Sequence, residues 1–342
     1  MAESNKEVYV KAEELLSLVS TKLANAGLNR KHAELTADVL VNADLRGVHS
    51  HGVIRTEHYV RRLKAGSLNG NPDFKFKTLR SGCGLFDADD GMGHVATNEA
   101  MTYAINMAKE SGIAMVGVEN SSHCGALSYF VTQAIENRMI GIAIVQTDKC
   151  VNPFGGAQPF FGTNPIAFGF PCEKNPPVIL DMATSNVAYG KVLHAREKNV
   201  SIPETWGLDQ DGAPTTDPHL VRGLTPLGGY KGYGIGMVVD VLTGILLGAQ
   251  FGPHIAAMYD GYEQKRKLAS TVIAIDPATY ISADHFMSQM DAMVDQLHAQ
   301  PTGPGFEKVL VPGDIELALE ERYRKDGVPV VGSIYQYLKG DQ

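Results

Sequence analysis

Hydrophobic positions recur at helical spacing near both ends of the chain. Residues 9–27 place their leucines and valines on one helical face and end at a glycine, and Asn29 is a suitable N-cap for the helix that follows. This pattern predicts helical layers in the first and last parts of the sequence. The expected helices cover residues 9–27, 30–46, 54–66, 283–299, 314–326 and 334–338.

The middle of the chain has a different periodicity. From about residue 74, short apolar or β-branched runs alternate with helical patterns, which is typical of a sheet with helices packed on it. Strands are expected over residues 84–87, 113–118, 142–145, 166–170, 178–180 and 269–276, and helices over 95–111, 125–138 and 185–197. Residues 231–248 form a long apolar stretch that predicts a largely buried helix.

These patterns together predict an α/β protein in which a central sheet domain is inserted between helical N- and C-terminal segments. We expect residues 1–75 and 280–342 to pack together as one helical unit that serves substrate binding and dimer formation. Residues 76–279 would form the α/β domain. The length of 342 residues is ample for two such units, each with its own core.

Charge and composition exclude several classes of partner. The net charge of −8, without any lysine- or arginine-rich run, does not suit a nucleic-acid binder, which must neutralise phosphates. The longest apolar stretch, residues 232–252, contains Asp240 and several glycines, so we expect no membrane span. The four cysteines are widely spaced and the first residues are polar, so we expect a reducing compartment, the cytoplasm.

A glycine pattern at residues 91–96 (Gly-Met-Gly-His-Val-Ala) matches the short fingerprint of Rossmann dinucleotide sites. It follows an expected strand and opens an expected helix. However, Asp87, Asp89 and Asp90 lead directly into it, and three carboxylates would repel a pyrophosphate. We therefore interpret Gly91 and Gly93 as a turn that opens a helix, and we expect a sheet domain of non-Rossmann type.

Residues 49–52 (His-Ser-His-Gly) connect two expected helices and carry the first candidate chemistry. Backbone N–H groups at the start of the second helix can face an anion, and Arg55 lies where its planar fork can bind a carboxylate beside Ser50 and His51. Two alternatives stay open. His49 and His51 could be metal ligands of a lyase or hydrolase, although no third ligand is visible, or they could merely cap a helix.

The second candidate is the loop at residues 120–125 (Asn-Ser-Ser-His-Cys-Gly), which follows an apolar strand. Loops at the carboxyl ends of strands are common ligand sites in α/β proteins. His123 can accept a hydroxyl proton there, because an ordinary histidine titrates near neutral pH. We interpret the neighbouring Cys124 as a buried thiol, since the sequence carries no signature of a Cys-His nucleophile.

Three further loops could hold a cofactor. Residues 161–165 (Phe-Gly-Thr-Asn-Pro) lead into a strand, residues 180–185 connect a strand to a helix, and residues 228–234 open the long apolar helix. Lys231, at the start of that helix and among glycines, is a plausible phosphate contact. Each loop alone is weak evidence, because a glycine before a helix is usually only a turn.

Taken together, these segments resemble the malate/L-lactate/ureidoglycolate dehydrogenase family, which is distinct from the Rossmann-fold lactate and malate dehydrogenases. The matching stretches are residues 46–55 (RGVHSHGVIR), 122–125 (SHCG), 161–165 (FGTNP), 180–183 (LDMA), 214–217 (PTTD) and 230–234 (YKGYG). The resemblance implies a nicotinamide cofactor in a non-Rossmann α/β domain and a homodimer with its active site in a cleft. The implied cofactor is NAD, with NADP also open.

The resemblance also implies roles for individual residues. His123 would be the general acid/base, and Arg55 with Ser50 and His51 would bind the substrate carboxylate. No metal ligand is implied. The implied cofactor contacts are Thr147, Asp181, Met182, Ala183, Lys231, Gly313, Asp314 and Ile315.

Within the family, residues 128–134, 190–193, 201–206, 258–260, 304–306 and 334–338 are most similar to the members that oxidise ureidoglycolate. The expected reaction is hydride transfer between a 2-hydroxy acid and the nicotinamide, here ureidoglycolate to oxalurate. One departure favours malate or L-lactate as the alternative substrate, because the residues just before His123 follow the pattern of those members. A noncatalytic nucleotide-binding protein is a further alternative.

Overall fold

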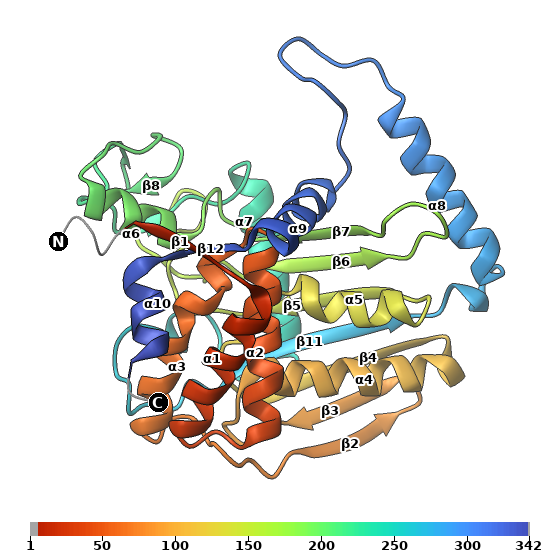
Figure 1. The fold of residues 1–342 in the computed structure, drawn as a ribbon, viewed down its shortest axis with the longest axis horizontal. Helices are drawn as coiled ribbons and strands as arrows, with labels where there is room; N and C mark the ends of the chain where they lie inside the picture. Colours follow the sequence, from red (N-terminus) through yellow and green to blue (C-terminus); the bar gives the residue numbers. More distant parts are fainter. Residues whose placement is uncertain (1–5, 341–342) are drawn as a thin grey trace.

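The computed structural model describes residues 6–340 and contains a seven-stranded mixed sheet (Figure 1). Its strand order is β2-β3-β4-β11-β5-β6-β7. Only the β3–β4 pair is parallel, and the other neighbours in this sheet are antiparallel. The strands are β2 (Lys75–Arg80), β3 (Cys83–Asp87), β4 (Ile113–Ser121), β11 (Leu268–Ile275), β5 (Ile140–Val145), β6 (Ile166–Phe170) and β7 (Val178–Met182).

Helices cover both faces of this sheet. On one face lie α4 (Gly93–Ser111) and α5 (Ser128–Glu136), and their buried side chains form one core with β3, β4, β5 and β11. On the other face lies α7 (Tyr230–Asp240), continued by the π-helical turn η3 (Val241–Ile245). The prediction of an α/β protein with a non-Rossmann sheet is therefore confirmed.

The two ends of the chain pack together, as the sequence predicted. Helices α1 (Ala12–Asn25), α2 (Arg30–Leu45), α3 (Thr56–Lys64) and α10 (Gly332–Lys339) share one apolar core. The side chain of Asn29 caps α2 by accepting a hydrogen bond from the His32 N–H. Two strands that the sequence did not predict, β1 (Glu7–Val10) and β12 (Val328–Val331), pair antiparallel and join the two ends.

The remaining elements extend the sheet domain at its edge. Helix α8 (Ala283–His298) lies beyond the end of the sheet, where Met290 and Val294 share a small apolar core with Val178 of β7, and α9 (Asp314–Asp326) returns to the N-terminal helices. Helix α6 (Tyr189–Lys198) and the short strands β8 (Gly207–Leu208), β9 (Pro214–Thr215) and β10 (Gly223–Leu224) share a small separate core. Two 3-10 turns, η4 (Gly252–His254) and η5 (Pro277–Thr279), flank β11. The domain boundaries at 75/76 and 279/280 stay a prediction.

Helix α7 differs from the prediction of a largely buried helix. Its inner face packs closely, since a Cβ on Gly236 would lie 3.0 Å from the Thr184 hydroxyl. Its outer face is apolar but solvent-exposed in the single chain, because no other segment of residues 6–340 covers that side. The exposed side chains are Ile235, Met237, Val238, Val241, Ile245 and Leu246. Among residues 6–340, no helix has the length and hydropathy to cross a membrane.

The glycines at 91 and 93 serve close packing of backbone against backbone. A Cβ on Gly93 would lie 2.2 Å from the carbonyl oxygen of Ser122. The Ser122 hydroxyl accepts a hydrogen bond from the Gly93 N–H (2.8 Å) and donates one to the Gly91 carbonyl (3.0 Å). The first turn of α4 therefore lies against the loop that carries His123, and Ser122 takes the place that a phosphate would need.

We predict that Gly93→Ala destabilises the protein by about 3 kcal/mol, at the upper end of overpacking effects, because the new methyl group would meet backbone atoms that have no room to move. The free energy of unfolding measured in urea tests this. Gly303→Ala is the matched control, since its Cβ would meet nothing closer than 3.9 Å. A Gly93→Ala protein as stable as the control would contradict the packing described here.

Candidate active site

One cavity of about 250 Å³ brings together side chains from three separate parts of the chain. Ser50, His51 and Arg55 enter it from the connection between α2 and α3, His123 from the loop after β4, and Thr147 from the end of β5. All five had been predicted from the sequence as site residues. The structure places them around one space that is large enough for a small molecule.

The connection between α2 and α3 is held by a buried carboxylate. It consists of two 3-10 turns, η1 (His49–His51) and η2 (Val53–Arg55), rather than the helical start that the sequence suggested. Asp44 accepts a hydrogen bond from the Val53 N–H (2.7 Å) and lies 2.9 Å from His49 Nδ1. This carboxylate raises the pKa of His49. His49 is thus a partner of Asp44, and η1 turns Ser50 and His51 toward the cavity.

The guanidinium of Arg55 is fixed by two contacts. Its Nε donates to the carbonyl of Ser50 (2.6 Å), and its Nη1 donates to the hydroxyl of Tyr259. Ser50 Oγ lies 2.9 Å from His51 Nδ1, so these three polar groups form one cluster. Within residues 6–340, Nη2 has no hydrogen-bond partner and is available to an anion.

His123 is surrounded by groups that disfavour a positive charge. Its ring stacks on that of His51, with centroids 5.4 Å apart. Burial lowers the pKa of His123 well below its ordinary value of 6.5, and His51 and the Arg55 cation add to this effect. Burial and Arg55 also lower the pKa of His51 to about 4. Both rings are therefore neutral at pH 7, and His123 has a free lone pair.

Two buried residues that the sequence analysis missed orient the His123 ring. The Tyr59 oxygen lies 2.7 Å from His123 Nδ1 and 3.5 Å from His94 Nε2. Burial raises the pKa of Tyr59 and lowers that of His94 to about 3, so the phenol keeps its proton and His94 is neutral. Tyr59 follows Arg55 by four residues, a spacing that would have placed both on one helical face.

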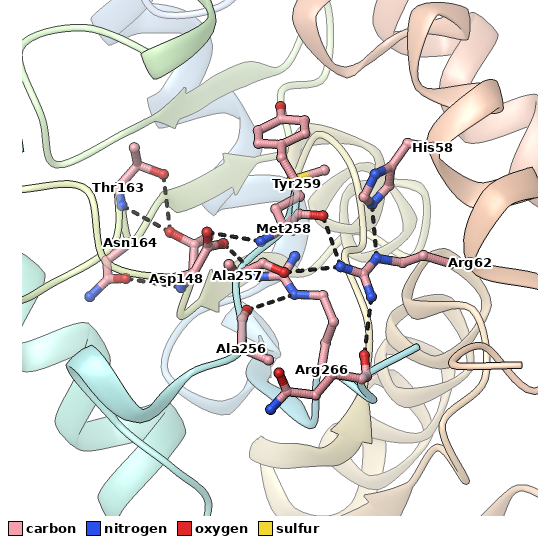
Figure 2. Close-up of polar contacts among 12 residues, drawn as sticks. His58, Arg62, Asp148, Thr163, Asn164, Ala256, Ala257, Met258, Tyr259 and Arg266 are labelled. Carbon is pink, nitrogen blue, oxygen red and sulfur yellow. Dashed lines mark hydrogen bonds and ion pairs between the residues drawn. The ribbon is translucent and has the colours of Figure 1, made fainter. Parts of the chain in front are cut away.

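A segment without helix or strand closes another side of the cavity. We call residues 256–266 the strap; its members Met258, Tyr259 and Arg266 line the cavity. Arg266 is buried and forms an ion pair with Asp148 (2.5 Å), whose other oxygen accepts a hydrogen bond from the Met258 N–H (3.0 Å) (Figure 2). The sequence of the strap has no helical or strand periodicity, and no site residue was predicted in it.

A series of threonines links the cavity to the ends of β6 and β7. The Thr147 hydroxyl accepts a hydrogen bond from the Thr163 N–H (2.9 Å), and the Thr163 carbonyl accepts from both the N–H and the hydroxyl of Thr184 (2.9 Å each). Gly162 is required here, because a Cβ would lie 2.0 Å from the Thr147 hydroxyl. The segment at residues 161–165 is thus a close-packed support under Thr147.

The proposed cofactor residues Asp181, Met182 and Ala183 lie at the end of β7, outside the cavity. One carboxylate oxygen of Asp181 accepts a hydrogen bond from the N–H of Ser128, at the start of α5 (2.7 Å), and the side chain is otherwise exposed. Lys231 is exposed in the first turn of α7. The Leu227 N–H donates to the Thr184 carbonyl (2.9 Å), which holds the start of α7 near Ala183.

The last proposed contacts, Gly313, Asp314 and Ile315, begin α9 beside β7. The Ile179 N–H donates to the carbonyl of Pro312 (3.0 Å), so this turn lies two residues along the strand from Asp181. Asp314 accepts a hydrogen bond from the Val311 N–H and lies 2.8 Å from His298 Nε2. Both contacts use the same carboxylate oxygen, Oδ2, and one of them joins the start of α9 to the end of α8, whereas Ile315 is exposed.

Two alternatives for the chemistry gain no support from this geometry. Within residues 6–340, no three histidine, cysteine or acidic side chains cluster as a metal site would require. His49 and His51 point to different partners, Asp44 and Ser50. Cys124 is buried, as the sequence predicted, and burial raises the pKa of its thiol to about 12, which disfavours the thiolate that a nucleophile needs.

Comparison with known proteins agrees with this architecture over the whole chain. The family model described as malate/L-lactate dehydrogenase matches residues 10–339. The ureidoglycolate dehydrogenase (NAD(+)) of Escherichia coli strain K12 is 42% identical over 97% of this chain and 95% of the relative. Among solved structures, the sulfolactate dehydrogenase of Methanocaldococcus jannaschii has a TM-score of 0.91 and is 35% identical, covering 97% of this chain and 96% of that one.

A second solved structure, the malate dehydrogenase from Entamoeba histolytica, has a TM-score of 0.92 at 27% identity and covers 98% of this chain and 97% of that one. These relatives share the fold with this chain but carry names for different hydroxy acids. The likeness therefore extends to the family and the fold. The chain belongs to the malate/L-lactate dehydrogenase family.

Proposed function

We propose that the protein is an NAD-dependent dehydrogenase of a 2-hydroxy acid, and that its substrate is ureidoglycolate, which it oxidises to oxalurate. The observation that carries the proposal is the neutral ring of His123 facing the same cavity as the Arg55 cation. A 2-hydroxy acid presents a hydroxyl and a carboxylate on neighbouring carbons. The cavity therefore offers one group for each. The relative named ureidoglycolate dehydrogenase (NAD(+)) supports the choice of substrate and cofactor.

Arg55 binds the substrate carboxylate in this proposal. Its contacts with the Ser50 carbonyl and the Tyr259 hydroxyl orient the guanidinium before substrate arrives, so little freedom is lost on binding. Ser50 and His51 lie beside it and share a hydrogen bond, so this pair can donate one further hydrogen bond to the same anion, from Ser50 Oγ or from His51 Nε2. Because His51 is neutral, it can take part in binding the carboxylate without placing a second positive charge beside Arg55.

His123 accepts the hydroxyl proton of the substrate at Nε2. We infer that Nδ1–H donates to the Tyr59 oxygen and that the Tyr59 hydroxyl donates to His94 Nε2, which leaves the His123 Nε2 lone pair facing the cavity. Bound NAD would supply the acceptor for the hydride that leaves the same carbon. The protein itself orients the substrate and manages the proton.

Thr147 would hold the nicotinamide end of NAD, and residues outside the cavity would hold the rest. The exposed oxygen of Asp181 suits a ribose hydroxyl, and Met182 and Ala183 continue along the same turn. Lys231 lies at a helix N-terminus, where a phosphate gains from both the cation and free backbone N–H groups. Gly313, Asp314 and Ile315 flank this path, with Ile315 offering an exposed apolar surface.

The proposal is tested by measuring NADH and NADPH formation with ureidoglycolate, malate, L-lactate and sulfolactate. We expect the highest kcat/KM with ureidoglycolate and NAD. Malate or lactate as the preferred acid would replace the proposed substrate and retain the enzyme class, while no cofactor reduction with any 2-hydroxy acid would refute the class itself.

With the acid and cofactor that the wild type uses best, His123→Ala should lower kcat by about 10³-fold, which is typical of a lost acid/base group, while NAD binding is retained.

The lowered pKa of His123 makes a prediction for the pH dependence. A histidine whose pKa is below 6.5 keeps its basic form to lower pH than an ordinary one, so oxidation should persist below pH 6.5. We expect the acid limb of the kcat/KM profile for the hydroxy acid to have its midpoint below pH 6.5. A midpoint at or above that value would show that His123 is not depressed in the free enzyme, or is not the base.

We further propose that the enzyme is a homodimer that works in the cytoplasm. All four cysteines are free thiols, in keeping with a reducing compartment. The apolar outer face of α7 and η3 supports self-association, because contiguous exposed apolar patches usually mark interfaces. This face lies next to Lys231, so association would order the helix that carries a proposed cofactor contact.

We predict that Val238→Glu, on the outer face of α7, converts the dimer into a monomer, because a carboxylate there would be buried without a partner. Sedimentation equilibrium measures the change. Leu220→Glu is the control, since Leu220 is equally exposed (50% against 54%) but lies outside this face. A Val238→Glu protein that remains dimeric, or a wild type that is monomeric, would place the interface elsewhere or remove it.

A further inference from the structure

Arg62 is a buried cation whose shorter hydrogen bonds go to backbone carbonyl groups, with the Ser67 hydroxyl as a longer contact (3.4 Å). It lies on α3, is only 2% exposed, and forms no ion pair with a carboxylate among residues 6–340. Its Nη2 donates to the carbonyls of Ala257 (2.9 Å) and Met258 (2.8 Å), and its Nη1 donates to that of Gln264 (3.1 Å). Figure 2 shows this guanidinium pointing at the strap.

Burying a charge without a counterion is expensive, so these hydrogen bonds must offset the lost hydration. The neighbouring His58 helps as a neutral acceptor: its Nε2 lies 3.3 Å from Arg62 Nε, and burial and Arg62 lower its pKa to about 3. A leucine or methionine could fill the same core position without this cost. The presence of a cation at this position therefore indicates that the function of Arg62 is to form hydrogen bonds with the strap.

The strap depends on hydrogen bonds from side chains such as Arg62, because it lacks the regular backbone hydrogen bonds of a helix or a sheet. It runs between η4 and β11 without helix or strand. Met258 is held from both sides, by Asp148 at its N–H and by Arg62 at its carbonyl. At the end of the strap, Lys265 forms an ion pair with the buried carboxylate of Asp90 (2.6 Å).

The position of the strap determines where two of the cavity-lining side chains lie. Met258 and Tyr259 line the cavity, and the Tyr259 hydroxyl contacts Arg55. Arg62 itself does not line this cavity. Any shift of the carbonyls of residues 257 and 258 would move Tyr259 away from Arg55 and change the orientation of that guanidinium.

We propose that Arg62 is a positioning residue for hydroxy-acid binding. It holds the backbone of the strap so that Tyr259 braces Arg55, and it does this without contacting the substrate. The inference rests on the proposed role of Arg55 as the carboxylate receiver. Arg62 donates hydrogen bonds to three carbonyl groups that are spread along the strap. The ammonium group of a lysine at the same position would bind only some of these carbonyls.

Arg62→Gln and Arg62→Lys test the proposal with the hydroxy acid that the wild type oxidises best. We expect Arg62→Gln to raise the KM for that acid at least tenfold, to change the KM for NAD less than about twofold, and to lower kcat less than KM rises. Arg62→Lys should lie between Arg62→Gln and wild type. Lys64→Gln, an exposed cation on the same helix, is the control and should leave all three constants unchanged.

A double-mutant cycle with Tyr259→Phe separates positioning from general destabilisation. If Arg62 acts through Tyr259, the KM effect of Tyr259→Phe should largely vanish in the Arg62→Gln background, so the two effects are not additive. Additive effects, equal rises in both KM values, or failure of both Arg62 variants to fold would overturn the proposal. A wild type inactive toward every 2-hydroxy acid would instead refute the proposed function, so the two failures are distinct.

Discussion

The structure of this active site depends on burying an imidazole next to an arginine. His123 stacks on His51 and lies close enough to Arg55 for the guanidinium charge to act on its ring. A positive charge on the ring is costly there, so His123 stays basic and neutral where an ordinary histidine is partly protonated. The same arginine that we propose as the receiver of the substrate anion therefore keeps the proposed proton acceptor neutral. Hydride transfer from a 2-hydroxy acid needs both conditions at once.

Three parts of the fold must meet for this arrangement to exist. The N-terminal helices supply Arg55 and Tyr59, the sheet supplies His123 and Thr147, and the strap returns from far along the chain to close the cavity. Polar groups join the parts where no regular structure does. The C-terminal strand β12 and helix α10 complete the core beneath the first part, which explains why both ends of the chain are needed.

Much of this could be predicted from the sequence where the signal was periodic or local. The long helices, the Asn29 cap and the central strands follow from spacing and local pattern, whereas the grouping of Arg55 with His123 was implied by the family resemblance. The pairing of β1 with β12 could not, because four-residue strands carry no period that distinguishes them from loops. Tyr59 was recognisable only through its spacing from Arg55, and the strap had no signal because its hydrogen bonds go to distant side chains such as Asp148.

The proposed function depends on one arrangement, in which Arg55 receives the carboxylate while His123 faces the neighbouring oxygen. A crystal structure of the enzyme with NAD and oxalurate tests it most directly. We expect the oxalurate carboxylate on the Arg55 guanidinium and its 2-oxo oxygen within hydrogen-bond distance of His123 Nε2. A carboxylate bound at any other cation of the cavity, with the 2-oxo oxygen turned away from His123, would contradict the claim.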